Sequence, residues 1–352
     1  MKKILFSTLI VMGGVFSVTS CGSSKGVVDY AAPEEQGLNI QKITDENSNT
    51  VLGSGTSFAG SGALGRLANL AKGNDFALSS RGGCRSAKFY WYTNRLLAVS
   101  PDGSEIGYLT RSNKQDNIMI RRATAQGAST QRTFRDISDF TWGIDDNLYF
   151  SDYSDGTHTQ IGATSARAGS IIRQITNNNV DKNPVLSKDG TLLLFTREDK
   201  TGPSIWSLNL KDNTLTSCAR GYNPCFVGES NDEFICVRNS TAGVSEIWLV
   251  NYVDGRETLI LSDKNRGFTN PTISPDGQWI LCQGNNTSSV KKKENLDIFA
   301  VRIDGSNFTQ ITYHPAMDCC PVWSADGKYI YFLSTRGNKD EYYNVWRMRF
   351  AL

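Results

Sequence analysis

Short apolar runs follow polar turns at a regular interval over residues 96–352. Four of the turns have the sequence Ser-X-Asp-Gly, and the run behind each turn is continuously apolar rather than alternating. The runs occupy residues 106–109, 192–195, 234–237, 279–282 and 329–333. Continuous apolarity in so short a run is typical of a strand that is covered on both faces.

The turns recur with a period near 45 residues. Their glycines, Gly103, Gly190, Gly277 and Gly327, are 87, 87 and 50 residues apart, and each interval of 87 accommodates two units. A second phrase, a β-branched residue before a large one, keeps the same step at Ile118-Met119, Ile205-Trp206, Ile247-Trp248, Ile298-Phe299 and Val345-Trp346. An X-Pro step precedes the turns at Asn183-Pro184, Asn223-Pro224, Asn270-Pro271 and Cys320-Pro321. Independent phrases that share one period indicate internal repeats.

Each unit is predicted to hold four strands, with the Asp-Gly turn between the first two. Glycine supplies the positive φ that a tight hairpin needs, so we expect the turn carboxylates to cap hairpins rather than to form a metal-binding ring; they are Asp102, Asp189, Asp276 and Asp326. Radial stacking of such units covers both of their apolar faces. The pattern therefore predicts an all-β, six-bladed β-propeller over residues 96–352. Its first strands are expected near Leu97, Thr141, Val185, Cys225, Thr272 and Val322.

The last unit stops at Leu352, directly after its third strand. The closing phrase of other units, at 173–176 and 309–312, recurs at residues 41–44 as Gln-Lys-Ile-Thr. We therefore expect residues 38–44 to supply the missing fourth strand and close the ring; the alternative is an unattached tail. Residues 45–95 are interpreted either as an irregular insert or as a degenerate seventh blade, and we retain six blades.

The N-terminus has the pattern of an export signal. Lys2 and Lys3 precede a mostly apolar stretch at 4–18, which at about 15 residues is too short to span a bilayer. The following Val-Thr-Ser-Cys at 18–21 resembles the lipobox of bacterial lipoproteins. That resemblance implies a signal peptide at 1–20, an acylated Cys21, a flexible tether at 21–37 and an outer-membrane location, with the periplasmic face favoured over the cell surface. An ordinary secretory signal peptide is the alternative.

Charge and cysteine content narrow the classes of partner. Lys and Arg number 37 against 35 Asp and Glu, and removal of Lys2 and Lys3 leaves no net charge, so we expect no nucleic-acid partner. Seven cysteines remain besides Cys21, and Cys218 and Cys225 are candidates for a disulfide because they bracket a short connection. Cys236 and Cys282 lie in apolar runs and are predicted to be buried.

We expect no catalytic residues, metal or cofactor. The two histidines, His158 and His314, fall at dissimilar places in the repeat and lack a recognisable nucleophile or orienting group. The candidate partner-binding residues are instead on two loops: Lys291, Lys292 and Lys293 in the fifth unit, and Tyr342 and Tyr343 in the sixth. The alternative for the lysine loop is that it is simply solvated. The aromatic residues of the second phrase are interpreted as packing between blades.

Residues 270–277 (Asn-Pro-Thr-Ile-Ser-Pro-Asp-Gly) and 322–328, followed by Phe-Leu-Ser-Thr-Arg-Gly at 332–337, resemble the WD-like repeats of the TolB-type propeller family. In that family the repeat occurs in transport scaffolds, peptidases and sensors. TolB itself carries an α/β domain before its propeller and partners a peptidoglycan-associated lipoprotein, and the residues before the first clear unit here are too few for that domain.

These features predict a non-enzymatic, lipid-anchored cell-envelope protein whose propeller at 38–352 is a docking scaffold for other envelope or outer-membrane proteins. One alternative is a central-channel binder of carbohydrate or peptide for nutrient capture. Another is a propeller-type hydrolase or lyase.

Overall fold

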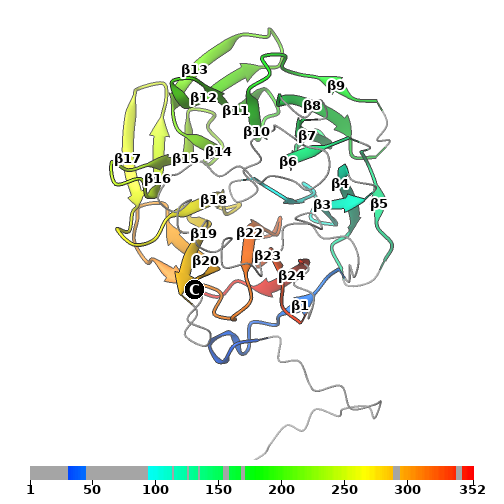
Figure 1. Cartoon of the computed structure of the whole chain (residues 1–352), viewed down its shortest axis with the longest axis vertical. Helices are drawn as coiled ribbons and strands as arrows, with labels where there is room; N and C mark the ends of the chain where they lie inside the picture. The colour runs from blue at the N-terminus through cyan, green and yellow to red at the C-terminus, as the bar shows by residue number, and fades with distance from the viewer. Residues whose placement is uncertain are drawn as a thin grey trace, which may run out of the picture.

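The computed structural model describes residues 31–44 and 94–352, apart from 113–114, 125–126, 134, 154–157, 168–170, 288–293 and 338–342. Within these residues the strands form six four-stranded antiparallel sheets, which Figure 1 shows arranged as blades around a central axis. The predicted all-β, six-bladed propeller is confirmed. The predicted insert at 45–95 lies almost wholly outside the described residues.

Each blade runs from an innermost first strand to an outermost fourth strand. Blade 1 comprises β2 (Leu97–Val99), β3 (Glu105–Ser112), β4 (Gln115–Arg122) and β5 (Thr130–Gln131). Blade 2 comprises β6 (Ile137–Trp142), β7 (Asn147–Asp152), β8 (Gln160–Ser165) and β9 (Arg173–Gln174). Blade 3 comprises β10 (Asp181–Leu186), β11 (Leu192–Asp199), β12 (Gly202–Asn209) and β13 (Leu215–Arg220). Each predicted first strand is confirmed here and in the remaining blades.

The other three blades follow the same order. Blade 4 comprises β14 (Tyr222–Phe226), β15 (Glu233–Asn239), β16 (Ser245–Asn251) and β17 (Arg256–Leu261). Blade 5 comprises β18 (Phe268–Ile273), β19 (Trp279–Thr287), β20 (Glu294–Arg302) and β21 (Thr309–Gln310). Blade 6 comprises β22 (Asp318–Trp323), β23 (Tyr329–Ser334), β24 (Asn344–Arg349) and β1 (Gln41–Lys42).

The N-terminal strand closes the ring, as predicted. Strand β1 pairs antiparallel with β24, with Gln41 opposite Arg347 and Lys42 opposite Trp346. The Ile43 amide donates to the Val345 carbonyl at 2.8 Å, and the Ile43 side chain is buried. The last blade therefore consists of three strands from the C-terminal end of the chain and one from the N-terminal end, and β24 has no open edge.

The Asp-Gly turns cap hairpins, as predicted. In blade 1 the Ser100 hydroxyl donates to Asp102 at 2.6 Å and accepts from the Glu105 amide at 2.9 Å, while Asp102 accepts from the Ser104 amide at 3.0 Å. These hydrogen bonds lower the pKa of Asp102 to about 2. The same set of bonds recurs at Ser187–Asp189, Ser274–Asp276 and Ser324–Asp326.

A threonine hydroxyl ends the outermost strand in four blades. Blades 1, 2, 5 and 6 have outer strands of only two residues, and a threonine two positions after the end of each strand accepts a hydrogen bond from an amide of the third strand. The amide-to-hydroxyl pairs are Ile118–Thr133 at 2.9 Å, Ile161–Thr176 at 3.0 Å, Ile298–Thr312 at 2.9 Å and Val345–Thr44 at 2.9 Å. The threonine thus replaces part of the backbone ladder, and Thr44 makes the same bond as its counterparts in continuous blades.

Blades 3 and 4 differ from the other four in this respect. Their outer strands, β13 and β17, are six residues long and pair through the backbone with β12 and β16. Among the described strands neither has a partner on its other side, and both lie on the outer perimeter of the ring in Figure 1. This side of the propeller therefore presents two long open strand edges.

A buried ion triad fastens the N-terminal segment beside blade 6. Glu35, in the 3-10 helix Pro33–Glu35, receives two hydrogen bonds of 2.7 Å from Arg336 and a third from the Tyr313 amide. Arg336 also donates to Asp318 at 2.5 Å and 3.2 Å, and all three side chains are inaccessible to solvent. Burial alone raises the pKa of Glu35, but the bonds and charge of Arg336 outweigh it and leave that pKa lowered.

The hydrophobic cores lie between neighbouring blades. One cluster joins blades 4 and 5 around Phe268 and Ile280, and another joins blades 5 and 6 around Trp346. Cys282 is buried in the layer between blades 4 and 5 and Cys236 in the layer between blades 3 and 4, as predicted. The predicted Cys218–Cys225 disulfide is wrong: both thiols are free. Cys218 lies on the outermost strand of blade 3 and Cys225 on the innermost strand of blade 4, so the short connection between them runs from rim to axis.

Candidate functional site

A pocket opens where blade 3 passes to blade 4. The connectivity of each blade places its second hairpin and its link to the next blade at one end of the ring, and the Asp-Gly turns at the other end. The pocket is at the hairpin end and has a volume of about 460 Å³. It is lined by Thr201, Gly202, Pro203, Ser204, Trp206, Ser217, Ala219, Arg220, Gly221, Tyr222, Arg238 and Asn239.

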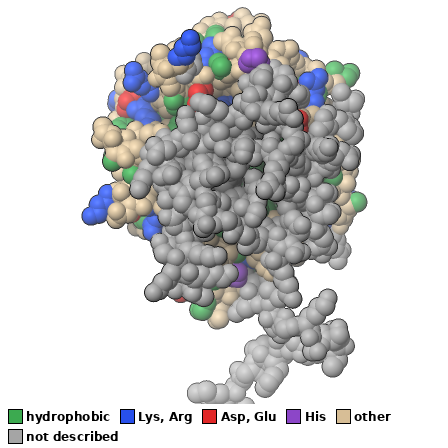
Figure 2. Space-filling model, viewed as in Figure 1, with side chains coloured by type: hydrophobic (Ala, Val, Ile, Leu, Met, Phe, Trp, Pro, Cys, Tyr) green, Lys and Arg blue, Asp and Glu red, His purple; other side chains and the backbone are tan. Residues whose placement is uncertain are grey.

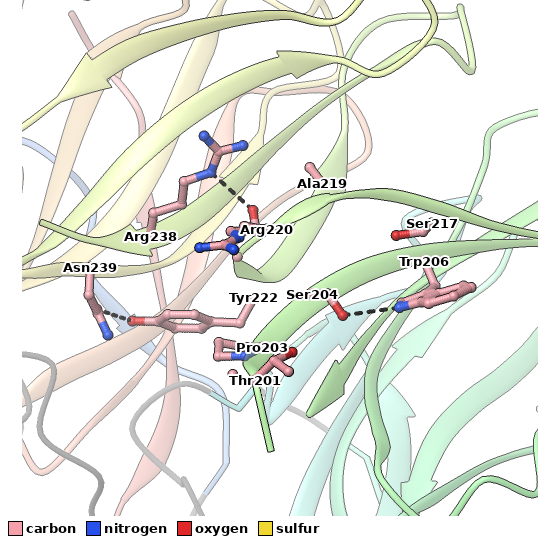
Figure 3. Close-up of a pocket in the computed structure, with 12 residues that line it drawn as sticks. Thr201, Pro203, Ser204, Trp206, Ser217, Ala219, Arg220, Tyr222, Arg238 and Asn239 are labelled. Atoms are coloured by element: carbon pink, nitrogen blue, oxygen red, sulfur yellow. Dashed lines mark hydrogen bonds between the residues drawn. The ribbon is translucent and has the colours of Figure 1, made fainter. Parts of the chain in front are cut away.

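The lining combines aromatic surface with hydroxyl groups. Figure 3 shows Trp206 and Ser204 on one side, Tyr222 and Asn239 on the other, and Pro203 between them. The Trp206 indole donates to Ser204 at 3.0 Å, and the Tyr222 hydroxyl donates to Asn239 at 3.2 Å. Because these groups already have partners within the chain, they hold the two rings in fixed positions.

The two arginines of the pocket have different roles. Arg238 forms two bonds of 2.7 Å with Glu257 and donates to the Arg220 carbonyl at 3.0 Å, so its charge is neutralised and it supports the end of β13. Arg220 is exposed, as is Lys200 in the neighbouring β11–β12 turn. Within the described part of the chain, neither Arg220 nor Lys200 forms an ion pair, and Arg220, which lines the pocket, gives it one positive charge that no carboxylate neutralises.

A single glycine makes this geometry. Gly221 is the only residue between β13 and β14, and it has φ +125°, a conformation that L side chains rarely adopt. A Cβ at this position would lie 2.8 Å from the Val237 carbonyl oxygen. The absence of a side chain therefore allows the long outer strand of blade 3 to turn directly into the axis.

The blades that form this pocket carry charges of both signs and two exposed leucines. Figure 2 shows Lys and Arg side chains, with some Asp and Glu among them, along the rim at the upper left, the part of the ring that blades 3 and 4 form in Figure 1. Leu215 and Leu259, on the two long outer strands, are 42% and 45% exposed. Exposed leucines beside unpaired strand edges are uncommon on a surface without a partner.

A second polar cluster lies at the axis, built from the X-Pro steps. Asn183, Asn223, Asn270 and Cys320 all have positive φ, between +52° and +56°, and each sits in a bulge of its first strand. Asn223 donates to Asn270 at 2.6 Å, and Asn270 donates to the Asn94 carbonyl at 3.0 Å. The bulges thus connect blades 4, 5 and 1 across the centre of the ring.

Buried charges accompany this axial cluster. Asp139 accepts hydrogen bonds from Ser151 at 2.9 Å and Ser138 at 3.2 Å, and Arg95 donates to the Pro224 carbonyl. Burial is the main cause that raises the pKa of Asp139 to about 6. Nη1 of Arg95 and both side-chain amide atoms of Asn183 are buried without a hydrogen-bond partner among the described residues.

Of the predicted interaction residues, the structure describes only Tyr343. Lys291, Lys292, Lys293, Tyr342 and Cys21 lie outside the described residues. Tyr343 is 1% exposed, and its hydroxyl is 3.3 Å from the sulfur of Met317, so its expected place on a partner-binding surface is wrong. A tyrosine beside the start of β24 packs inward because it belongs to the layer between blades 6 and 1.

The histidines lie far apart in the fold. His158 is exposed on the β7–β8 connection of blade 2, whereas Nδ1 of His314 accepts from the Ala316 amide at 3.0 Å between blades 5 and 6. Within the described ranges, no three His, Cys, Asp or Glu residues are grouped closely enough to hold a metal ion. Those ranges also contain no helix long and apolar enough to cross a membrane.

No motif in the sequence predicts this pocket. Trp206 packs partly against the core between blades 2 and 3, as predicted for the aromatic residues of the second phrase, but it also forms a wall of the pocket. The available signal was the absence of a closing threonine phrase in units 3 and 4, together with a strand-like run at 215–220 that leads into Gly221.

The comparisons with known proteins agree with the fold. No family model matches the chain. TolB from Acinetobacter baumannii is similar in structure, with a TM-score of 0.58 and 15% identity over 71% of this chain and 65% of that chain. A protein described as TolB from Agrobacterium tumefaciens has a TM-score of 0.54 and 16% identity over 73% of this chain and 90% of that chain. The resemblance to TolB-type propellers is thus confirmed for the fold.

One curated protein matches a short segment. Dipeptidyl-peptidase 5 of Porphyromonas gingivalis is 35% identical over 65 residues, which are 18% of this chain and 10% of that protein. This chain therefore spans a tenth of the curated relative, and it covers less than two thirds of the Acinetobacter TolB chain.

Proposed function

We propose that this TolB-like propeller is a non-enzymatic, lipid-anchored envelope protein that docks another envelope protein through blades 3 and 4. The observation that carries the proposal is the asymmetry of the ring. Four blades end in short outer strands tied off by a threonine, whereas β13 and β17 are six residues long and have open edges. Open edges are usually blunted unless they serve an interaction.

The pocket beside these edges supports the same assignment. It joins the end of β13 to blade 4, and it offers fixed aromatic rings and an exposed cation within one concave site. Aromatic residues and arginine are enriched where protein partners bind. A rigid propeller that needs no rearrangement is suited to this kind of docking.

The N-terminal sequence supports anchoring at the outer membrane. The lipobox-like segment ends at Cys21, and the clasped strand begins at Gln41, so about twenty residues separate the proposed lipid from the ring. The ion triad at Glu35 fixes the end of this segment against blade 6. The tether is therefore attached beside blade 6, and blades 3 and 4 lie on the other side of the ring from this attachment (Figure 1).

The test is affinity capture of the full chain from detergent-solubilised envelopes, with Arg220→Glu compared with Arg122→Glu. Arg122 is an exposed arginine of blade 1 and provides the matched control. We expect a stoichiometric partner with the wild type and the control, and its loss from Arg220→Glu. If no partner is retained and the purified chain turns over a glycan or peptide, the proposal is overturned in favour of an enzyme.

A second candidate function is a ligand site at the axis. It rests on the buried Arg95 and Asn183 atoms that lack partners among the described residues, since buried polar groups are normally satisfied by protein, water or ligand. A glycan array and a peptide array with the purified chain test it. If binding is saturable, is abolished by Asn183→Leu and is unchanged by Arg220→Glu, the ligand binds at the axis rather than at blades 3 and 4.

A further inference from the structure

We propose that the partner of blades 3 and 4 presents an extended acidic peptide segment that adds to the open edge of β13 and places a carboxylate in the adjoining pocket. This inference rests on the proposed function and specifies the chemistry and binding mode of its partner.

The edge of β13 has the dimensions of a peptide site. The strand pairs with β12 from Leu215 to Arg220, and it is the last strand in its sheet among those described. Six residues of strand extend about 20 Å, which suits a peptide of six to eight residues. In such strand addition the main chain supplies affinity and pockets select alternate side chains.

The pocket lies where it can bind one side chain of a peptide that pairs with β13. Ser217, Ala219 and Arg220 belong both to β13 and to the pocket lining, so a peptide paired with this strand runs along the pocket mouth. The side chains of a strand alternate between faces, so only every second residue of the peptide faces the pocket. The site therefore selects a spaced pattern rather than a continuous sequence.

Charge determines which side chain fits. Arg238 is neutralised by Glu257, whereas Arg220 and Lys200 are exposed and form no ion pair within the described chain. Because Arg220 lines the pocket, its charge favours a glutamate or aspartate there and disfavours a lysine at the same position. Trp206 offers apolar surface in the same pocket, but Arg197 already lies over its ring, with the guanidinium carbon 4.6 Å from the ring centroid. Trp206 is therefore a wall of the pocket rather than a second cation-binding face.

The test measures binding of a fluorescent ten-residue peptide that alternates valine or threonine with glutamate. Three probes are compared with the full chain by fluorescence anisotropy: the glutamate peptide, its lysine counterpart, and the glutamate peptide with N-methyl groups on all of its central residues, which blocks both of its edges. We expect the lysine and N-methyl probes to bind at least about tenfold more weakly, because the first repels Arg220 and the second cannot pair with an edge.

Two variants test where on the chain the peptide binds. Arg220→Glu is expected to weaken the glutamate probe at least about tenfold and to favour the lysine probe, whereas Arg122→Glu in blade 1 leaves both affinities unchanged. Hydrogen exchange is expected to slow at 215–220 in the complex. Equal binding to Arg220→Glu, or protection at a different strand with none at 215–220, overturns the inference.

The outcome separates this inference from the proposed function. If an envelope protein is captured through Arg220 but the N-methyl probe binds as well as the unmodified one, docking at blades 3 and 4 stands and strand addition fails. If the lysine probe binds as tightly as the glutamate probe, the acidic partner is wrong. If neither a probe nor an envelope protein binds in an Arg220-dependent way, both proposals fail.

Discussion

Single residues in unusual conformations fix the centre of this ring. Three asparagines and Cys320 occupy the same positive-φ bulge before proline, and asparagine tolerates such φ values better than most residues do. The sequence shows the X-Pro steps plainly, but it does not show that the residue before each proline has positive φ and faces the axis. That geometry arises from packing of six strands around one axis, which no local pattern encodes.

Cys320→Asn tests this reading of the bulge. Asparagine is the residue at three equivalent positions, and its amide can replace the contact of the Cys320 sulfur with the Asn94 carbonyl at 3.5 Å. We expect the free energy of unfolding to rise by roughly 1 kcal/mol, because a non-glycine residue at positive φ is strained. Denaturant unfolding measures this change, and an unchanged or lower free energy of unfolding contradicts the interpretation.

Asp139 predicts a pH dependence of stability. Its carboxyl pKa is about 6 in the fold, above the ordinary 3.8, so the folded state holds a proton that the unfolded state releases between these values. The stability contributed by this group is therefore full below about pH 4 and is lost as the pH rises through 6, a difference of roughly 2–3 kcal/mol.

The measurement compares wild type with Asp139→Asn, which keeps the shape of the group and removes its titration. The free energy of unfolding of the wild type relative to the variant is expected to fall between pH 4 and pH 7. A difference that stays constant across this range contradicts the raised pKa.

At the scale of elements, the repeats were predictable because short local sequence motifs specify each of their turns and strands. The Ser-X-Asp-Gly turns, the apolar second strands and the closing Gln-Ile-Thr phrase each perform one physical task in the fold. The same logic correctly placed residues 41–44 on blade 6, three hundred residues away in sequence. It did not identify β13 and β17 as unusual, because their signal is the lack of a threonine phrase rather than the presence of a motif.

Thr44→Val tests the clasp. The substitution removes the hydroxyl that accepts from the Val345 amide and donates to Asn344, so it is expected to cost about 1–3 kcal/mol. Thr312→Val is the matched control, because it removes the same bond in a continuous blade. Both variants lose stability, but only Thr44→Val is expected to speed hydrogen exchange and proteolysis at 38–44. Equal protection of 38–44 in the two variants would falsify the clasp.

For the whole molecule, the fold was predictable and the docking side was not. Six blades and their closure follow from repeated patterns, whereas the pocket depends on Gly221 bringing the outer edge of one blade against the next. The predicted loop tyrosine, Tyr343, is buried instead. Composition and motifs therefore predict the propeller, and the asymmetry of the assembled ring supports the proposal that it docks a partner through blades 3 and 4.

Cys21→Ser tests the anchor. Acyl chains bound to Cys21 would hold the ring at the membrane, since each buried methylene contributes about 0.8 kcal/mol. The wild-type chain is expected to incorporate an alkyne-labelled palmitate and to fractionate with outer membranes, and the variant to lose both properties. Cys84→Ser is the control. Label retained by Cys21→Ser would place the acylation at another residue, and an unlabelled wild type cut after Ser20 would indicate an ordinary secreted protein; either result contradicts an anchor at Cys21.

Photo-cross-linking in living cells tests the docking claim most directly. The photoreactive residue replaces Leu215 on β13 or, as the control, the exposed Thr130 on the outer strand of blade 1. The account predicts an envelope-protein adduct from position 215 that Arg220→Glu abolishes and Arg122→Glu spares, with none from position 130. An adduct at 130 alone, or one at 215 that Arg220→Glu leaves unchanged, contradicts it.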